Sequence, residues 1–233
     1  MAKRNRNVSD IEETYVETVE TVRHEVDQST DWFEKNKKLI LGLIAAFMLI
    51  AAAFIVYKFF VKEPLEKEAK AAIFKAEQQF ARDSFALALE NPGGGYDGLL
   101  DVIDNYSGTS TANLAKLYAG ISYLNLGRFE DAISYLNSHS SSGTYSPILK
   151  NGNLGDAYSE NGDFDKALTF YDKATSASED ALLTPYYLYK LGLLSKKQGN
   201  NSKALSAFNK IKDKYPASEE ASSIDLLITS VSN

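Results

Sequence analysis

Few residues of this chain have the types and spacing that chemistry at a site requires. The 233 residues include no Cys and two His, which excludes disulfides, thiolate metal sites and Cys nucleophiles. His24 and His139 lie far apart without a sequence-adjacent partner that would make either a base, so both are interpreted as solvated. Gly93, Gly94 and Gly95 are not followed by the Gly-Lys-Ser/Thr of a phosphate loop, and they predict a turn.

The charged pairs of the chain are better explained by folding than by catalysis. Acidic pairs stand near expected helix starts, where carboxylates favour the helix dipole: Glu130 with Asp131, Asp163 with Asp165, and Glu219 with Glu220. The basic pair Lys196 and Lys197 stands at an expected helix end. The net charge of -6 argues against nucleic acid. The sequence therefore predicts a protein that is not an enzyme, without catalytic, cofactor-binding or metal-binding residues and without a small-molecule substrate.

One segment has the composition of a membrane-spanning helix. Residues 39–57 read LILGLIAAFMLIAAAFIVY and carry no charge. At about 1.5 Å rise per residue, this run extends about 28 Å, close to the hydrocarbon thickness of a bilayer. A cleaved signal peptide fits poorly because a long polar segment precedes the run, and a buried core helix rarely stays uncharged on every face. The sequence predicts a transmembrane helix over residues 39–61.

Residues 1–38 form a polar, acidic tail before this span. Apolar side chains recur in the tail at helical spacing, at Ile11, Tyr15, Val19, Val22 and Val26. The stripe predicts an amphipathic helix that packs on a partner or lies on a membrane, with a partly frayed solvated helix as the alternative. Lysine counts beside the span favour a cytoplasmic C-terminal side. Long domains translocate largely regardless of charge, so composition leaves the orientation open.

Residues 62–233 contain an internal repeat with steps of 35 and 37 residues. Three units share two glycines and an alanine: Gly120, Gly127 and Ala132; Gly155, Gly162 and Ala167; Gly192, Gly199 and Ala204. The first glycine and the alanine are expected on successive helices, where small side chains allow a close crossing. The second glycine supplies the positive φ that ends the first helix. Large side chains follow each alanine by four residues, on the same helical face: Leu136, Tyr171 and Phe208.

These spacings resemble the tetratricopeptide repeat, a helix–turn–helix unit of about 34 residues. A degenerate fourth unit is expected before the clear three, with residues 63–89 as its first helix and residues 103–106 ending its second. Residues 218–230 predict a capping helix. The expected fold is all-α: a single transmembrane helix followed by a tetratricopeptide-repeat α-solenoid of about four helix pairs with a C-terminal capping helix.

In this repeat class, the first helix of each pair lines an inner groove. Register with the family gives these candidate protein-binding residues: Leu114, Leu117, Ile121, Leu124, Tyr186, Tyr189 and Leu193. Relatives that grip a C-terminal carboxylate need Lys and Asn where this chain has Leu117, Ile121, Gly152 and Asp156, so that mode is not expected. The groove suits an amphipathic helix or an unfolded segment. That the helix over residues 63–89 fills the groove instead is an alternative that the sequence leaves open.

The juxtamembrane sequence carries a more specific resemblance. Residues 32–39 read WFEKNKKL, Gly42 lies inside the span, and Tyr57 and Lys58 end it. This layout resembles the YfgM-like family, ancillary subunits of the SecYEG translocon, although the acidic tail is longer than the family pattern. The resemblance implies a bacterial inner-membrane protein with a cytoplasmic N-terminus and periplasmic repeats near the exit of the secretion channel.

The function implied is binding. The span is expected to dock beside a membrane complex through its small-residue face, Gly42, Ala46 and Ala53. Tethering would then raise the effective concentration of the groove near emerging chains, periplasmic chaperones and their clients. The alternative is an assembly scaffold for another cell-envelope membrane complex with a fixed folded partner.

Overall fold

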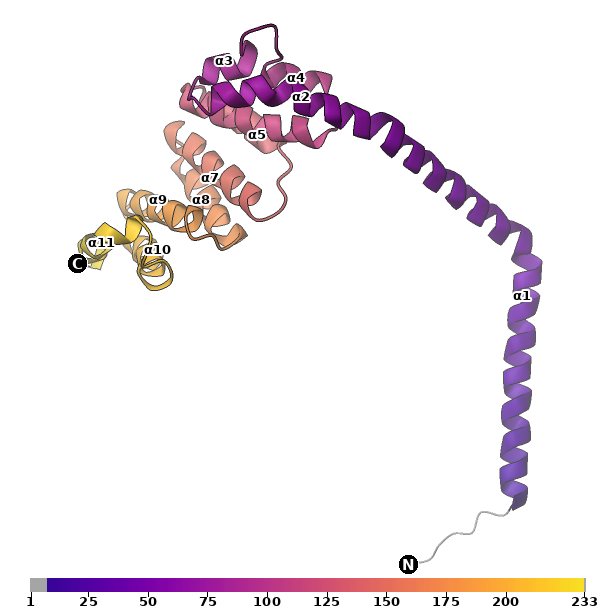
Figure 1. Ribbon diagram of the computed structural model, residues 1–233. Coiled ribbons are helices and arrows are strands. Elements are labelled where there is room, and N and C mark those ends of the chain that lie inside the picture. The colour runs from indigo at the N-terminus through magenta and orange to yellow at the C-terminus, as the bar shows by residue number, and fades with distance from the viewer. Residues whose placement is uncertain (1–7, 233) are drawn as a thin grey trace, which may run out of the picture. The chain divides into compact units, whose positions relative to one another are not determined.

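The computed structural model describes residues 8–232, with side chains described except at residues 8–14, 22, 24–31 and 33. The chain divides into two compact units, Met1–Val61 and Lys62–Asn233, which are described separately. All regular structure within residues 8–232 is helical, without a strand (Figure 1). The all-α prediction, an N-terminal apolar helix followed by a helical solenoid, is therefore confirmed.

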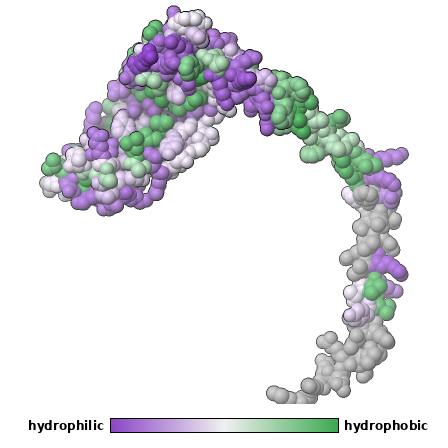
Figure 2. All heavy atoms as spheres, viewed as in Figure 1, coloured by the Kyte–Doolittle hydropathy of each residue, from purple (hydrophilic) through white to green (hydrophobic). Residues whose placement is uncertain are grey.

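The first unit is one long helix, α1 (Val8–Tyr57), followed by a π-helical turn, η1 (Lys58–Lys62). Its apolar part has no protein cover, and Figure 2 shows it as a run of hydrophobic residues along the helix. By length and composition, it is the one helix within residues 8–232 that could cross a membrane. In the tail, Tyr15 and Val19 of the predicted apolar stripe are exposed. Ile11, Val22 and Val26 fall outside the described side chains.

The second unit stacks helices in chain order, from α2 to α11 (Figure 1). The stack begins irregularly, with three helices in place of a pair: α2 (Glu63–Phe80), α3 (Phe85–Glu90) and α4 (Leu99–Asn105). Three regular pairs follow: α5 (Ser110–Asn125) with α6 (Phe129–Ser138), α7 (Tyr145–Glu160) with α8 (Phe164–Ala177), and α9 (Leu183–Lys197) with α10 (Asn201–Lys214). A 3₁₀ turn, η2 (Glu220–Ser223), leads to α11 (Ile224–Ser232), which packs on α10 as the expected capping helix.

The prediction of a single helix over residues 63–89 is wrong, because residues 81–84 separate two helices, α2 and α3. Asp83 has a φ of 57°, the left-handed conformation that short polar side chains tolerate and that ends a helix. The Ser84 N–H then donates to the Gln79 carbonyl over 2.9 Å. The break turns α3 back, and its buried residues Ala88 and Leu89 pack in the cluster shared with α2, α4 and α5.

The repeated small residues are where the helices of each pair meet. A Cβ added to Gly120 would lie 2.6 Å from Leu136, one added to Gly155 would lie 2.5 Å from Tyr171, and one added to Gly192 would collide with Phe208. The three alanines of the pattern are fully buried. Gly127, Gly162 and Gly199 have φ angles of 74°, 81° and 74° just after the first helices. The residue roles inferred from the repeat are thus confirmed.

Candidate functional site

A groove of about 650 Å³ opens along the first helices of the three regular pairs. The end of α5 and the start of α6 contribute Leu124, Asn125 and Phe129; α7 contributes Asp156, Ser159 and Glu160; α9 contributes Lys190, Leu193 and Lys197. Three successive repeats therefore build one surface, which combines apolar side chains with both signs of charge.

Two glycines of α7 determine how the floor of this groove is built. Gly152 leaves room for the ring of Tyr187 from α9, and Gly155 leaves room for the ring of Tyr171 from α8. The two rings stack with centroids 6.3 Å apart. With its ring held against α7, Tyr171 donates its hydroxyl hydrogen to Asp156 Oδ1 over 2.6 Å. Close helix packing thus places a polar contact at the base of the groove.

Asp156 also joins α7 to α9 through an ion pair. Lys190 Nζ donates to the same Oδ1 atom over 2.7 Å, and the two side chains are only 28% (Lys190) and 15% (Asp156) exposed. Burial alone would lower the pKa of Lys190, but the charge of Asp156 and its hydrogen bond raise the Lys190 pKa above its usual value. Burial and the neighbouring Asp156 charge raise the pKa of Tyr171, so its hydroxyl remains a donor at physiological pH.

The seven residues predicted to line the groove are distributed over four environments. Leu124 and Leu193 do line it. Tyr186 is 41% exposed and packs edge-on against Tyr187, and Lys190 Nζ lies 4.7 Å from the centroid of its ring. Tyr189, Leu114 and Ile121 are half-buried and pack against core clusters.

Leu117 is not available to a partner, contrary to the prediction. It is 4% exposed and packs with Leu136 and Leu154, because it faces the junction between α5, α6 and α7. Register with the repeat family does not predict the charged lining of the groove. Lys190, Leu193 and Lys197 recur at helical spacing on one face of α9, and that spacing was the available signal.

The groove is not filled by the helix that follows the span. In the described part of the second unit, α2 packs against α3, α4 and α5 and contributes no residue to the groove lining. Leu193 is 37% exposed and Tyr186 remains accessible beside it. The alternative of self-occupation by residues 63–89 is therefore not what the structure shows.

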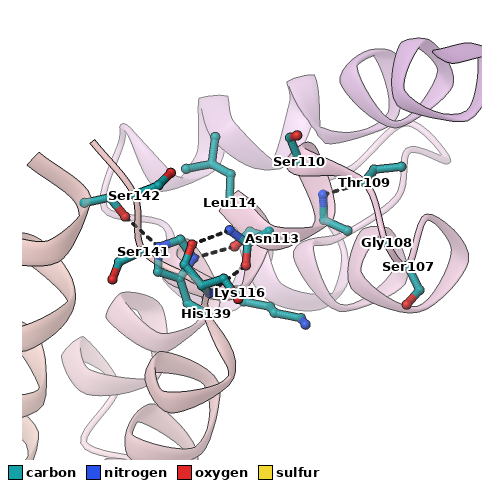
Figure 3. A pocket seen from close by; sticks show the side chains of 13 residues that line it. Ser107, Gly108, Thr109, Ser110, Asn113, Leu114, Lys116, His139, Ser141 and Ser142 are labelled. Carbon is teal, nitrogen blue, oxygen red and sulfur yellow. Dashed lines mark hydrogen bonds between the residues drawn. The ribbon is translucent and has the colours of Figure 1, made fainter. Parts of the chain in front are cut away.

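A second, polar pocket of about 620 Å³ is lined by residues from the start of α5 and from the loops before α5 and α7 (Figure 3). His139 lies here and is 4% exposed, so its interpretation as solvated is wrong. Its Nδ1 lies 2.7 Å from the Asn113 carbonyl oxygen, and its Nε2 lies 2.7 Å from Ser146 Oγ. Asn113 in turn holds Ser140 through bonds of 2.9 and 2.8 Å. These contacts fasten the loop onto α5, which is a structural role.

The remaining predicted positions have simpler surroundings. Gly42, Ala46 and Ala53 are exposed on α1, and a Cβ added to Gly42 would meet nothing within 4 Å in the chain. The side chain of His24 falls outside the described residues. Among the side chains that are described, no group of three His, Asp or Glu is placed to hold a metal ion.

The stacked helix pairs and their continuous groove define the second unit as a helical repeat solenoid. Two family models, each described as tetratricopeptide repeat, match residues 151–180 and residues 186–218. These matches fall on α7 with α8 and on α9 with α10, so the chain contains tetratricopeptide repeats. Comparison with curated proteins and with solved structures gave no match.

Proposed function

We propose that this protein is a membrane-anchored scaffold that binds segments of other polypeptides in the groove of its repeats, without catalysing a reaction. The observation that carries the proposal is the open groove across α5, α7 and α9, where Leu193 is exposed beside a half-buried ion pair and Tyr186 is exposed next to Lys190. Tetratricopeptide repeats typically mediate protein–protein interaction and are typically non-enzymatic. A concave surface with apolar anchors and a few fixed polar groups suits peptide recognition.

The proposed anchor is the apolar part of α1. In this proposal, residues 1–38 form a cytoplasmic tail, residues 39–61 cross a bacterial inner membrane, and residues 62–233 form the periplasmic repeat domain. An exposed, uncharged helical surface of this length is stable in lipid and unfavourable in water, which supports the assignment. A reporter enzyme that is active only in the cytoplasm, fused after Asn233, is expected to be inactive. An active fusion would reverse the orientation.

The proposed location of the protein is beside the Sec translocon, as an accessory subunit that holds or relays emerging chains or chaperones. This is supported by the resemblance of residues 32–39 and the ends of the span to the YfgM-like family. The span would contact the channel through Gly42, Ala46 and Ala53, since small residues let helix backbones approach closely in lipid. Photocrosslinkers at Ala46 and Ala53 are expected to capture a channel subunit. If they capture only lipid, the translocon assignment fails.

The binding function is tested by photocrosslinkers at position 193 in the groove and at position 186 beside it, in the full chain in cells. Positions 186 and 193 are expected to capture polypeptides, whereas Thr169 and Ser206, exposed on the second helices α8 and α10, serve as matched controls. Equal capture at all four positions would contradict the proposal. Capture of a single folded envelope protein at 186 and 193 would instead favour the alternative, an assembly scaffold with a fixed partner.

A further inference from the structure

The groove presents opposite charges on two of its walls. On α7, Glu160 follows Asp156 by one helical turn, and both line the groove. On α9, Lys197 follows Lys190 by two turns, and both line the groove as well. The acidic wall and the basic wall therefore face a common space.

On each wall, one charge is paired within the described chain and the other is not. Asp156 and Lys190 neutralise each other across the floor. Glu160 and Lys197 make no ion pair with the described residues, and Lys197 Nζ lies 4.8 Å from the centroid of the Phe164 ring. One acidic and one basic side chain of the groove are thus left without a carboxylate or ammonium partner within the chain described.

The groove also offers an exposed apolar side chain and a hydrogen-bond acceptor without a donor among the described residues. Both hydrogen bonds to Asp156 go to Oδ1, and Oδ2 accepts none from the described residues. Leu193, at 37% exposure, projects from the basic wall, and Leu124 lies at the α5 side of the groove. An incoming segment can therefore bury an apolar side chain here and donate an N–H to Asp156.

We propose that the occupant of the groove is a segment of another polypeptide in which an apolar residue is flanked by one basic and one acidic residue. The apolar side chain packs between Leu124 and Leu193, the basic side chain pairs with Glu160, and the acidic side chain pairs with Lys197. This inference rests on the proposed function and specifies its partner. Complementary charges on adjacent walls fix the direction in which the segment crosses the groove.

The test is selection of random short peptides displayed on phage against the full chain in lipid nanodiscs. Three forms are compared: the native protein, the charge reversal Glu160→Lys with Lys197→Glu, and a control reversal, Glu130→Lys with Lys210→Glu. Glu160, Lys197, Glu130 and Lys210 are all exposed, so both double variants are expected to fold, which circular dichroism verifies.

The native and control proteins are expected to enrich peptides with an apolar residue between a basic and an acidic residue, and to prefer one order of these two charges along the peptide. The groove reversal is expected to enrich the opposite charge order and to bind the native peptides about tenfold more weakly, since two partly exposed pairs become repulsive. Identical enrichment by all three forms would overturn this inference and leave peptide binding intact. No enrichment would also overturn it, and failed crosslinking at position 193 would then remove the proposed function as well.

Discussion

The hydroxyl group of Tyr171 lies 2.6 Å from the carboxylate oxygen of Asp156, so the second helix of one repeat fixes an acid that its first helix presents to the groove. The same oxygen pairs with Lys190 of the next repeat. Within-repeat packing and between-repeat pairing therefore converge on one carboxylate. These two contacts hold the Asp156 carboxylate in a fixed position at the floor of the groove.

Replacing Tyr171 with Phe is expected to destabilise the repeat unit by about 1.5–3 kcal/mol, because the buried Tyr171 side chain loses its hydrogen bond to a charged acceptor. Urea unfolding of the full chain in mild detergent, followed by far-ultraviolet circular dichroism, measures the change. Tyr145→Phe is the matched control, since Tyr145 is exposed, and its effect is expected to stay within about 0.5 kcal/mol. Equal effects of the two substitutions would show that the Tyr171 hydroxyl contributes nothing.

The close contacts of the repeat glycines predict an order of stability among alanine variants. Gly152→Ala is expected to cost about 1–3 kcal/mol, because its methyl group would overlap the buried ring of Tyr187. Gly120→Ala is expected to cost less, since its nearest contact, Leu136 Cγ at 2.6 Å, overlaps less than the Tyr187 ring does at Gly152. The favourable helix propensity of Ala offsets part of both costs. Urea midpoints in the reverse order would contradict this view of the α7–α9 contact.

The repeat glycines also show how far the sequence could predict the fold. Gly120, Gly155 and Gly192 mark helix crossings by their small size, so a shared register was enough to predict the pairs and their packing. The break at Asp83 was not predictable in this way, because it depends on one residue adopting a left-handed conformation that its type tolerates without requiring.

The groove was predicted less well than the helices, for a related reason. Register places Leu117 on a first helix but does not say which neighbour covers it, and its burial depends on Leu136 and Leu154 from other helices. His139 likewise looked solvated in a Ser-rich loop, because its partners Asn113 and Ser146 are separated from it in sequence. The Asp156–Lys190 pair spans two repeats and leaves no local pattern.

The buried imidazole of His139 predicts a pH dependence of stability. Burial lowers the pKa of His139 below its usual value, and the charges of Lys150 and Lys116 lower it further, against the opposing effect of the Asn113 carbonyl. The unfolded chain therefore binds a proton at a higher pH than the folded chain does, so stability rises with pH. The contribution is complete above about pH 6.5 and is lost as the pH falls toward the lower, folded-state pKa.

Melting temperatures of the full chain between neutral and mildly acidic pH check this expectation. The native protein is expected to lose stability on acidification, whereas His139→Gln, which cannot take up a proton, is expected to show a flatter profile. The variant should also be less stable at neutral pH, because it disturbs the bonds to Asn113 and Ser146. Parallel profiles for the two proteins would mean that His139 does not set the slope.

Two leucines that the repeat register placed in the same groove are expected to respond differently to a charge. Leu193→Asp adds a carboxylate at a side chain that is 37% exposed, so the unfolding free energy is expected to fall by only about 1 kcal/mol. Peptide capture is expected to fall about tenfold, because the apolar contact beside Leu124 is lost.

Leu117→Asp buries an unpaired charge among Leu136 and Leu154, and it is expected to cost more than about 3 kcal/mol. Urea unfolding and peptide binding, measured on the same preparations, separate the two effects. If Leu193→Asp left capture unchanged on a folded protein, the groove across α5, α7 and α9 could not be the binding surface.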